Sequence, residues 1–251
     1  MNARILFLKA RLKFFPRCAG KYDFNEILAH DGIKVGKGTI FYDPNTMSID
    51  RQRPWMIEIG EYCKITKGVT ILAHDYSRSV LRRAYGEVIG EAGHTVIGNN
   101  VFIGMHSIIL MGTHIGNNVI IGAGSVVSGN IPDNCVAAGN PCRVIRSLDE
   151  QYKLRKERSL EEAKEYYTSF VERYKRSPDI KEMGHFFPLF LRRTREELEK
   201  NGIDTHLNGD ESEEIIEGFL RSEPVFASYE QFKEWCEKEQ DGGTGTEGVC
   251  T

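Results

Sequence analysis

Two adjacent residues, His74 and Asp75, have side chains suited to proton transfer. Histidine is the side chain most often used as a general acid or base, because its unperturbed pKa of about 6.5 lies close to physiological pH. A carboxylate beside the ring could orient the imidazole, as in catalytic triads, and a backbone carbonyl could do the same. Asp before Tyr76-Ser77 is also a common turn former, and the bland alternative for His74 is a surface histidine in a turn.

A period of six residues over 97–128 indicates the element that positions His74. The branched residues at this spacing are Ile97, Ile103, Ile109, Ile115, Ile121 and Val127. The fifth position of each hexad is small or β-branched: Val101, Ser107, Thr113, Val119, Ser125 and Ile131. A helix repeats at about 3.6 residues and a strand at about 2, so neither explains the pattern. It is typical of a hexapeptide β-helix, in which three short strands and three corners complete one coil.

The same period precedes His74 and then breaks. Earlier positions at this spacing are Val35, Phe41 and Met47, in a degenerate coil, followed by Ile59, Ile65 and Ile71. Ile97 follows Ile71 by 26 residues, which is not a multiple of six. We therefore expect an excursion over 75–95 that leaves the coils directly after His74. Long insertions of this kind in compact domains are usually functional or disordered.

Four runs carry a resemblance to a known family: residues 68–77 (GVTILAHDYS), 99–104 (NNVFIG), 121–127 (IGAGSVV) and 137–145 (AAGNPCRVI). They resemble the left-handed parallel β-helix acyltransferases, and among these the maltose/galactoside and capsular-polysaccharide O-acetyltransferases. The resemblance covers roughly residues 30–148. It implies an all-β left-handed parallel β-helix over 31–148. The left-handed winding comes from the resemblance alone, because β-crossovers are usually right-handed.

The resemblance also implies a reaction and its residues. In this family the histidine that matches His74 is the general base, which removes a proton from a sugar hydroxyl. The hydroxyl oxygen then attacks the thioester of acetyl-CoA, the co-substrate. Asp75 is the candidate for orienting the ring. The backbone N–H of Met105, at the corner after residues 103–104, is the candidate donor to the oxyanion.

The acetyl-CoA site follows from the same resemblance. In the family the pantetheine arm lies in a groove between prisms, which here would touch Met105 and the corner at Ala123-Gly124. The nucleotide phosphates would lie near Arg143 and Arg146, since arginine binds phosphate through its planar fork; solvated surface charge is the alternative for each. Ser128 is included, although the family often has Thr-Lys where this chain has Ser128-Gly129. Because a second prism supplies one wall of the groove, the resemblance implies a homotrimer with active sites at subunit interfaces.

Three histidines raise the question of a metal. The β-helical carbonic anhydrases share this prism and bind zinc with three histidines, two of them five residues apart. Here His106 and His114 are eight residues apart and His94 lies next to the excursion, so the ligand pattern is not met. We expect no metal, with His106 facing either the acceptor and CoA groove or solvent.

Composition sets further bounds. The net charge of −3 argues against a nucleic-acid partner. The six cysteines show no paired metal spacing, and a chain of 251 residues needs no disulfide framework, so a reducing, cytoplasmic compartment is the simpler interpretation.

The two ends of the chain differ from the repeats. Residues 1–30 form an amphipathic N-terminal arm, whose first 20 residues hold five basic side chains and no acid. This segment either caps the end of the β-helix or lies on an anionic inner membrane surface. From 149 to 238 the pattern is helical, with capping boxes at Thr194, Asp210 and Ser228. The apolar run 186–191 must be buried, on the prism or on a neighbouring subunit.

Residues 239–251 have the composition of a disordered tail. The expected function is acetyl transfer from acetyl-CoA to a carbohydrate hydroxyl, in a capsular or other surface polysaccharide or its precursor. N-acylation of an amino sugar or nucleotide sugar is the alternative enzyme class. The non-enzymatic alternative is a scaffold whose helical region binds a partner. No motif names the acceptor sugar.

Overall fold

The computed structural model describes residues 2–16, 20–206 and 209–238, so the predicted disordered tail 239–251 lies outside the described residues. The chain divides into two compact units, Met1–Tyr152 and Lys153–Thr251. Within the described parts of the chain, no helix is long and apolar enough to cross a membrane.

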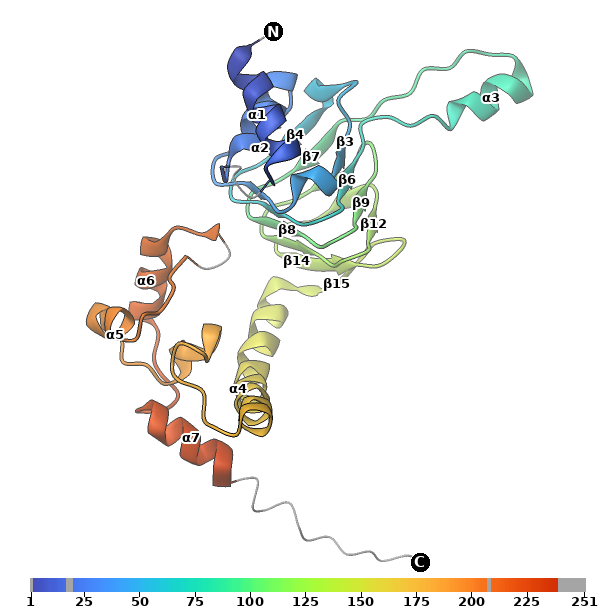
Figure 1. The fold of residues 1–251 in the computed structure, drawn as a ribbon. Coiled ribbons are helices and arrows are strands. Elements are labelled where there is room, and N and C mark those ends of the chain that lie inside the picture. The colour runs from blue at the N-terminus through green and yellow to red at the C-terminus, as the bar shows by residue number, and fades with distance from the viewer. Residues whose placement is uncertain (1, 17–19, 207–208, 239–251) are drawn as a thin grey trace, which may run out of the picture. The chain divides into compact units, whose positions relative to one another are not determined.

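The first unit is a parallel β-helix whose short strands form three sheets around one core (Figure 1). Sheet A contains β1 (Lys34–Val35), β4 (Ile57–Ile59), β7 (Thr95–Ile97), β10 (His114–Ile115) and β13 (Asn130–Ile131). Sheet B contains β2 (Ile40–Phe41), β5 (Lys64–Ile65), β8 (Val101–Ile103), β11 (Val119–Ile121), β14 (Cys135–Ala138) and β15 (Arg143–Ser147). Sheet C contains β3 (Ser48–Ile49), β6 (Thr70–Ile71), β9 (Ile108–Ile109) and β12 (Val126–Val127).

The predicted hexads form the interior of this prism. Every branched residue of the six-residue series and every fifth-position residue over 97–131 is buried. Equivalent residues stack from coil to coil, as where Ile97 pairs with Ile59 on one side and with Ile115 on the other. The buried hydroxyls at fifth positions are satisfied by backbone carbonyls, for example Thr113 Oγ1 donating to Val127 O at 3.1 Å.

The degenerate first coil differs from the prediction. Met47 packs against the core as expected, but so does Ile49, because a short 3₁₀ helix, Pro44–Thr46, lengthens the corner and makes Ile49 the inward residue of β3. Ile49 pairs with Ile71 of β6. This shift of two residues determines which side chain follows the strand, and that side chain is part of the candidate site.

The N-terminal arm forms two helices, α1 (Ala3–Phe14) and α2 (Asp23–Asp31), which pack on each other and on the first coil. Ile5, Leu8 and Leu12 of α1 are buried in the prism core, and Phe24 of α2 contacts Phe41 edge-on. The arm therefore covers an end of the β-helix that would otherwise expose unpaired strand edges.

The excursion after His74 contains a helix, α3 (Arg78–Tyr85), that the sequence pattern did not indicate (Figure 1). None of its side chains is buried. The excursion returns where Gly93 N donates to Ala73 O at 3.1 Å, and Thr95 already belongs to β7.

The second unit is helical and has its own core. Its helices are α4 (Leu148–Tyr174), which starts in the first unit, α5 (Arg195–Lys200), α6 (Ser212–Arg221) and α7 (Tyr229–Lys238). A 3₁₀ helix, Gly184–Leu189, carries most of the apolar run 186–191, whose Phe187, Phe190 and Leu191 are buried within this unit itself. The expectation that this run is buried on the prism or on another subunit was therefore wrong.

Two of the three predicted capping boxes supply N-terminal hydrogen bonds. Thr194 Oγ1 accepts from Glu197 N at 3.2 Å at the start of α5, and Ser228 Oγ accepts from Gln231 N at 3.2 Å at the start of α7. At α6 the N-cap residue is Glu211 rather than the predicted Asp210.

Candidate active site

His74 lies at the corner where the chain leaves sheet C, two residues after Leu72, whose N donates to Ile109 O at 2.9 Å. The side chain is 7% exposed, and the Tyr76 ring contacts the imidazole edge-on with centroids 5.3 Å apart. Because the side chain is buried, the alternative interpretation of His74 as a surface histidine in a turn does not apply.

The carboxylate that holds the His74 ring is Asp50, one coil earlier on the same corner. Asp50 Oδ2 contacts His74 Nδ1, and both side chains are buried. Asp50 N donates to Ile71 O at 2.9 Å, so the stacking of β3 on β6 fixes the backbone beneath the histidine. Asp50 also accepts from Gln52 N at 2.8 Å and from Ala73 N at 3.3 Å.

These contacts define the charge and tautomer of the pair. Burial disfavours the charged form of Asp50, but hydrogen bonds from His74 and from the backbone N–H groups of Gln52 and Ala73 hold the pKa of its carboxyl below its ordinary value. An ionised carboxylate can only accept, so Nδ1 carries a proton, and in the neutral ring Nε2 presents its lone pair. Within the described residues, this buried Nε2 has no hydrogen-bond partner. The imidazole is thus oriented as a base.

Asp75, the predicted orienting residue, makes different contacts. Its Oδ1 accepts from Ser77 N at 2.8 Å and from Ser77 Oγ at 2.6 Å, in a turn that starts the excursion. The Ser77 hydrogen bonds hold the pKa of this carboxyl below its ordinary value. The prediction that Asp75 orients the ring was wrong, and the turn-former interpretation describes its contacts.

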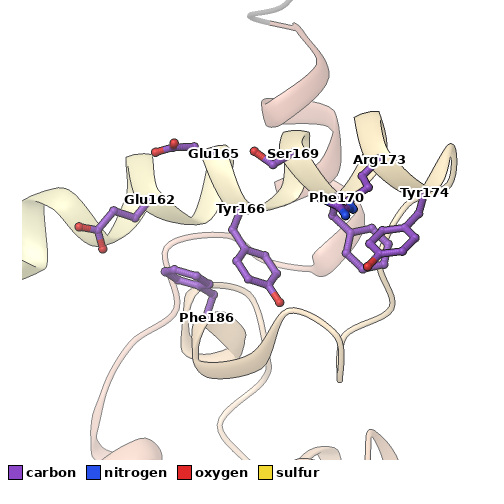
Figure 2. A pocket seen from close by; sticks show the side chains of 8 residues that line it. All are labelled: Glu162, Glu165, Tyr166, Ser169, Phe170, Arg173, Tyr174 and Phe186. Atoms are coloured by element: carbon purple, nitrogen blue, oxygen red, sulfur yellow. The ribbon is translucent and has the colours of Figure 1, made fainter.

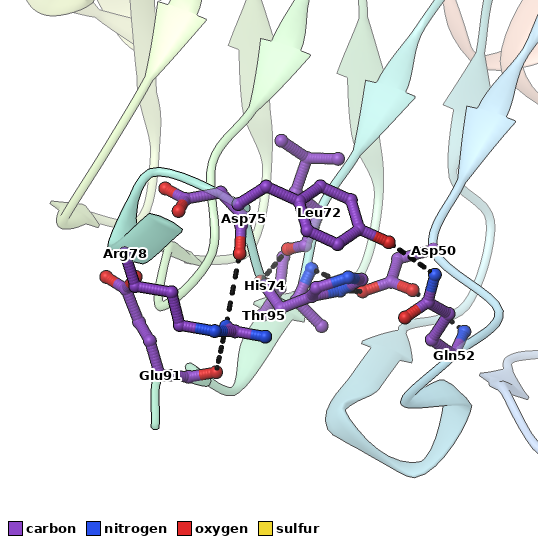
Figure 3. A network of polar contacts seen from close by, with 10 residues as sticks. Asp50, Gln52, Leu72, His74, Asp75, Arg78, Glu91 and Thr95 are labelled. Atoms are coloured by element: carbon purple, nitrogen blue, oxygen red, sulfur yellow. Dashed lines mark hydrogen bonds and ion pairs between the residues drawn. The ribbon is translucent and has the colours of Figure 1, made fainter. Parts of the chain in front are cut away.

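A cavity of about 480 Å³ opens beside the pair. It is lined by Ser48, Asp50, Arg51, Gln52, Leu72, His74, Asp75 and Tyr76. Figure 3 shows the network around it, in which Gln52 Nε2 donates to Tyr76 Oη at 2.7 Å while Gln52 N donates to Asp50. The Tyr76 ring and the Asp50 carboxylate are thereby linked to one residue of the preceding coil.

Arg78 joins the two limbs of the excursion at this corner. Its Nη1 donates to Asp75 O at 3.1 Å and to Glu91 O at 3.3 Å (Figure 3). One side chain therefore holds the outgoing and returning chain together immediately beyond His74.

The predicted acetyl-CoA residues lie on other parts of the prism. Met105 and Ala123-Gly124 share the corner between sheets B and C, where Gly124 N donates to Met105 O at 2.8 Å. Ser128 lies on the corner between sheets C and A, the same corner as His74 and two coils further along. Arg143 and Arg146 lie on β15, which pairs antiparallel with β14.

Local contacts hold these two arginines. Arg143 Nη1 donates to Cys142 O at 2.8 Å, and Arg146 Nη1 donates to Gln151 Oε1 at 3.2 Å. The structure thus brings Met105 close to 123–124, and it separates this cluster from His74 by the width of sheet C.

The remaining histidines lie on the outside of the prism. His94, His106 and His114 are all exposed. Over the ranges that the structure describes, no group of three or more His, Cys, Asp or Glu side chains could hold a metal ion.

Comparison with known proteins agrees with the repeat. Residues 94–129 match the family model "Bacterial transferase hexapeptide (six repeats)". Protein CapG of Staphylococcus aureus is 43% identical over 123 residues, which are 47% of this chain and 67% of CapG. Galactoside O-acetyltransferase of Escherichia coli K12 is 41% identical over 122 residues, 49% of this chain and 58% of that protein. The chain thus spans less than two thirds of this second relative.

Solved structures include a maltose O-acetyltransferase from Clostridium difficile 630, with 26% identity, a TM-score of 0.37, and coverage of 58% of this chain and 89% of that one. A hexapeptide-repeat acetyltransferase from Vibrio cholerae has 22% identity and a TM-score of 0.42, covering 59% and 94%.

Relatives that share this repeat are named acetyltransferases, and the chain is an acyltransferase. The chain belongs to the family of hexapeptide-repeat bacterial transferases.

Proposed function

We propose that the protein is an acetyl-CoA-dependent O-acetyltransferase that modifies a carbohydrate hydroxyl, in a capsular or other surface polysaccharide or its precursor. The observation that carries this proposal is the buried imidazole of His74, which contacts Asp50 and whose Nε2 has no hydrogen-bond partner among the described residues. A base with a free lone pair suits an acceptor that must lose a proton to become a nucleophile. We also propose that the coils wind in the left-handed sense, as the resemblance to the acyltransferases implies.

In this proposal the reaction proceeds through a tetrahedral intermediate. His74 Nε2 removes the proton of the sugar hydroxyl as the hydroxyl oxygen bonds to the thioester carbonyl carbon. The resulting imidazolium is stabilised by the Asp50 carboxylate on Nδ1. When the tetrahedral intermediate collapses, the carbon–sulfur bond breaks and the imidazolium returns its proton to the departing CoA sulfur. The acetyl ester and CoA are released.

The oxyanion donor and the cofactor cleft require two chains in this proposal. His74 lies on the corner between sheets C and A, and the Met105 N–H lies on the corner between sheets B and C. The strands of sheet C separate the two groups in one protomer, so both can act on one thioester only if a second prism supplies one of them. A homotrimer would build three such clefts. In each, Met105, Ala123, Gly124 and Ser128 would face the pantetheine arm, and Arg143 and Arg146 the phosphates.

The proposal includes a cytoplasmic location with contact of α1 at the inner membrane surface. Leu6, Phe7, Phe14 and Phe15 are between 54% and 66% exposed, while the opposite side of the helix is buried. Lys13 is close to the Phe14 ring. Aromatic side chains flanked by basic ones are typical of interfacial helices. Flotation with anionic vesicles, and its loss in a Phe7→Ser/Phe14→Ser variant, would test this contact.

A thiol-release assay with acetyl-CoA tests the proposal as a whole. The acceptors would be a panel of neutral, acidic and amino sugars, with product mass spectrometry to locate the acetyl group. Acetyl esters on hydroxyl acceptors would support O-acetylation. Acetyl amides alone would favour the amino-sugar alternative, and no release with any acceptor would favour a scaffold role.

A further inference from the structure

The second unit has a groove of about 580 Å³ along α4, and none of the residues assigned to catalysis is among the side chains that line it. Figure 2 shows the side chains that line it: Glu162, Glu165, Tyr166, Ser169, Phe170, Arg173, Tyr174 and Phe186. The volume falls within the range of about 300–1,000 Å³ that is usual for small-molecule sites.

The lining residues follow a regular pattern on the helix. A polar residue and an aromatic residue stand next to each other every four positions: Glu165-Tyr166, Ser169-Phe170 and Arg173-Tyr174. Residues four apart lie on one helix face, separated by about 6 Å along the axis. The groove therefore has a stripe of aromatic rings with a parallel stripe of hydrogen-bonding groups beside it.

The rings are held in place by their neighbours. Phe170 and Tyr174 lie 4.5 Å apart between ring centroids, and Tyr166 lies 5.6 Å from Phe186. Tyr166 Oη donates to Glu182 O at 2.9 Å, which fixes the direction of that ring.

A clamped guanidinium also contacts Phe170. Arg176 lies 5.0 Å from the Phe170 ring centroid and binds both carboxylate oxygens of Glu182, at 2.6 and 2.8 Å. This pair and the N–H of Asp179 lower the pKa of Glu182 to about 2, so the clamp remains ionised across the physiological range. The ring stripe is preorganised.

The chemistry of the lining selects a class of ligand. Among the described residues, every apolar side chain that lines the groove is aromatic and none is aliphatic. Ring faces carry negative charge density that attracts the polarised C–H groups on one face of a pyranose. Carboxylate, hydroxyl and guanidinium groups at the ring edges can pair with its hydroxyls. The charge of Glu162 is neutralised by Arg155. The opposite charges of Glu165 and Arg173 also cancel, so the lining has no net charge.

We propose that the groove along α4 binds a neutral oligosaccharide segment of the acceptor, with sugar rings packed on the exposed rings of Tyr166 and Tyr174, and with Phe170 supporting Tyr174. This inference rests on the proposed function, because it assigns the second unit to the same glycan. A second contact with the same glycan would let the enzyme retain a long acceptor between transfers.

Other ligands fit the groove less well. A groove that binds a partner helix or a second α4 usually presents aliphatic side chains. A surface that binds lipid usually has basic residues beside its apolar side chains and no acidic ones. Glu162, Glu165 and Arg173 are charged lining residues, so they present to a partner helix or a lipid only the methylene groups of their side chains.

Direct binding of the full-length protein tests the inference. Maltoheptaose and chitohexaose would be titrated by calorimetry and by saturation-transfer NMR, with a hyaluronan hexasaccharide as the anionic probe and glucose as the short one. We expect at least one neutral oligosaccharide to bind more tightly than glucose and than hyaluronan. Tyr174→Ala should weaken that binding roughly tenfold, as expected for loss of one aromatic contact. Glu165→Gln is a second, surface variant and should weaken it several-fold.

Tyr152→Ala is the matched control, because Tyr152 is an exposed tyrosine of α4 that does not line the groove. Equal affinity of Tyr174→Ala and the parent protein, or no binding of either neutral probe, would overturn the inference. So would a change of oligomeric state or of vesicle binding caused by Tyr174→Ala.

Enzyme assays separate this inference from the proposed function. With a monosaccharide acceptor, Tyr174→Ala should leave acetyl transfer unchanged, whereas KM for an oligosaccharide acceptor should rise. Absence of acetyl transfer to every acceptor would reject the proposed function while the titrations still report on the groove. Transfer without oligosaccharide binding would reject the groove alone.

Discussion

Asp50 and His74 lie 24 residues apart in the chain and in contact in the structure, carboxylate Oδ2 against imidazole Nδ1. Stacking of consecutive coils brings them together, because Ile49 pairs with Ile71 and each functional residue follows its strand at the same corner. The prism thus places a carboxylate on Nδ1, as the scaffold of a catalytic triad does, which in the proposed mechanism favours the tautomer with a free Nε2.

Asp50→Asn should reduce turnover without preventing folding. An amide can donate to Nδ1 and so favour the tautomer that protonates Nε2, which is the wrong form for a base. We expect kcat to fall by on the order of 10²–10⁴, with KM for acetyl-CoA little changed. Steady-state thiol release at saturating acceptor measures this.

Asp75→Asn is the matched comparison. Asp75 accepts from Ser77 and does not hold the ring, so its loss should affect turnover much less than loss of Asp50. Equal defects in the two variants would show that the Asp50 contact does not orient the base.

The Asp50 carboxylate also predicts how stability depends on pH. Its folded pKa is lower than its ordinary value of 3.8, so its ionised contacts stabilise the fold at every pH above about 4. This contribution is lost as pH falls through the folded pKa. The stability difference between the parent protein and Asp50→Asn should be roughly constant from pH 7 to 5 and shrink below pH 4. Urea unfolding at pH 7, 5 and 3.5 tests the sign.

Sequence spacing was sufficient to predict the prism because each coil must bury a branched residue on each of its three sides. Ile103, Ile109 and Ile115 repeat without a gap for that reason, and all are buried. The position of His74 at the break in this pattern could be read in the same way. Its partner Asp50 could not be predicted in this way. The 3₁₀ helix 44–46 inserts residues into the first coil, so the six-residue spacing points to Met47 whereas Ile49 occupies the strand position.

The second unit was beyond such reasoning for a different reason. Its core comes from elements far apart in sequence, as where Tyr229 Oη donates to Pro178 O at 2.7 Å, and no repeat links them. The polar–aromatic pairs along α4 are visible in the sequence once a helix is known there. Without the fold, Tyr166 and Tyr174 are equally compatible with core positions, and the two are in fact exposed.

His74→Ala should abolish base catalysis while leaving cofactor binding intact. Met105, Ala123 and Gly124 lie on another corner, and Ser128 lies two coils away from His74. CoA affinity should therefore stay within about twofold while turnover falls by on the order of 10²–10⁴. His114→Ala removes an exposed histidine of β10 and should be silent in both measurements. If both variants retain full activity, the role assigned to His74 is wrong.

Gly104→Ala should destabilise the prism. A Cβ at Gly104 would lie 2.4 Å from Ala123 N and 2.7 Å from Ala123 Cα, so the backbone of the next coil would have to move. Overpacking of this kind costs about 1–3 kcal/mol of unfolding free energy. Gly90→Ala, in the excursion, meets no atom within 4 Å and should change stability by less than about 0.5 kcal/mol. Parallel urea melts measure the difference, and equal stability of the two variants would contradict the close stacking of coils.

Arg78→Ala should loosen the excursion without affecting the prism. Arg78 donates to Asp75 O and to Glu91 O. Without its guanidinium, the outgoing and returning segments of the excursion lose the donor that they share beside His74. We expect faster proteolysis within 79–90 and a several-fold higher KM for the acceptor, with an unchanged midpoint for unfolding of the coils. Arg82→Ala, an exposed arginine of the same helix, provides the control for lost positive charge. Because both variants remove one charge, a KM defect confined to Arg78→Ala would come from the lost backbone contacts, whereas equal defects would attribute the effect to the charge of the excursion.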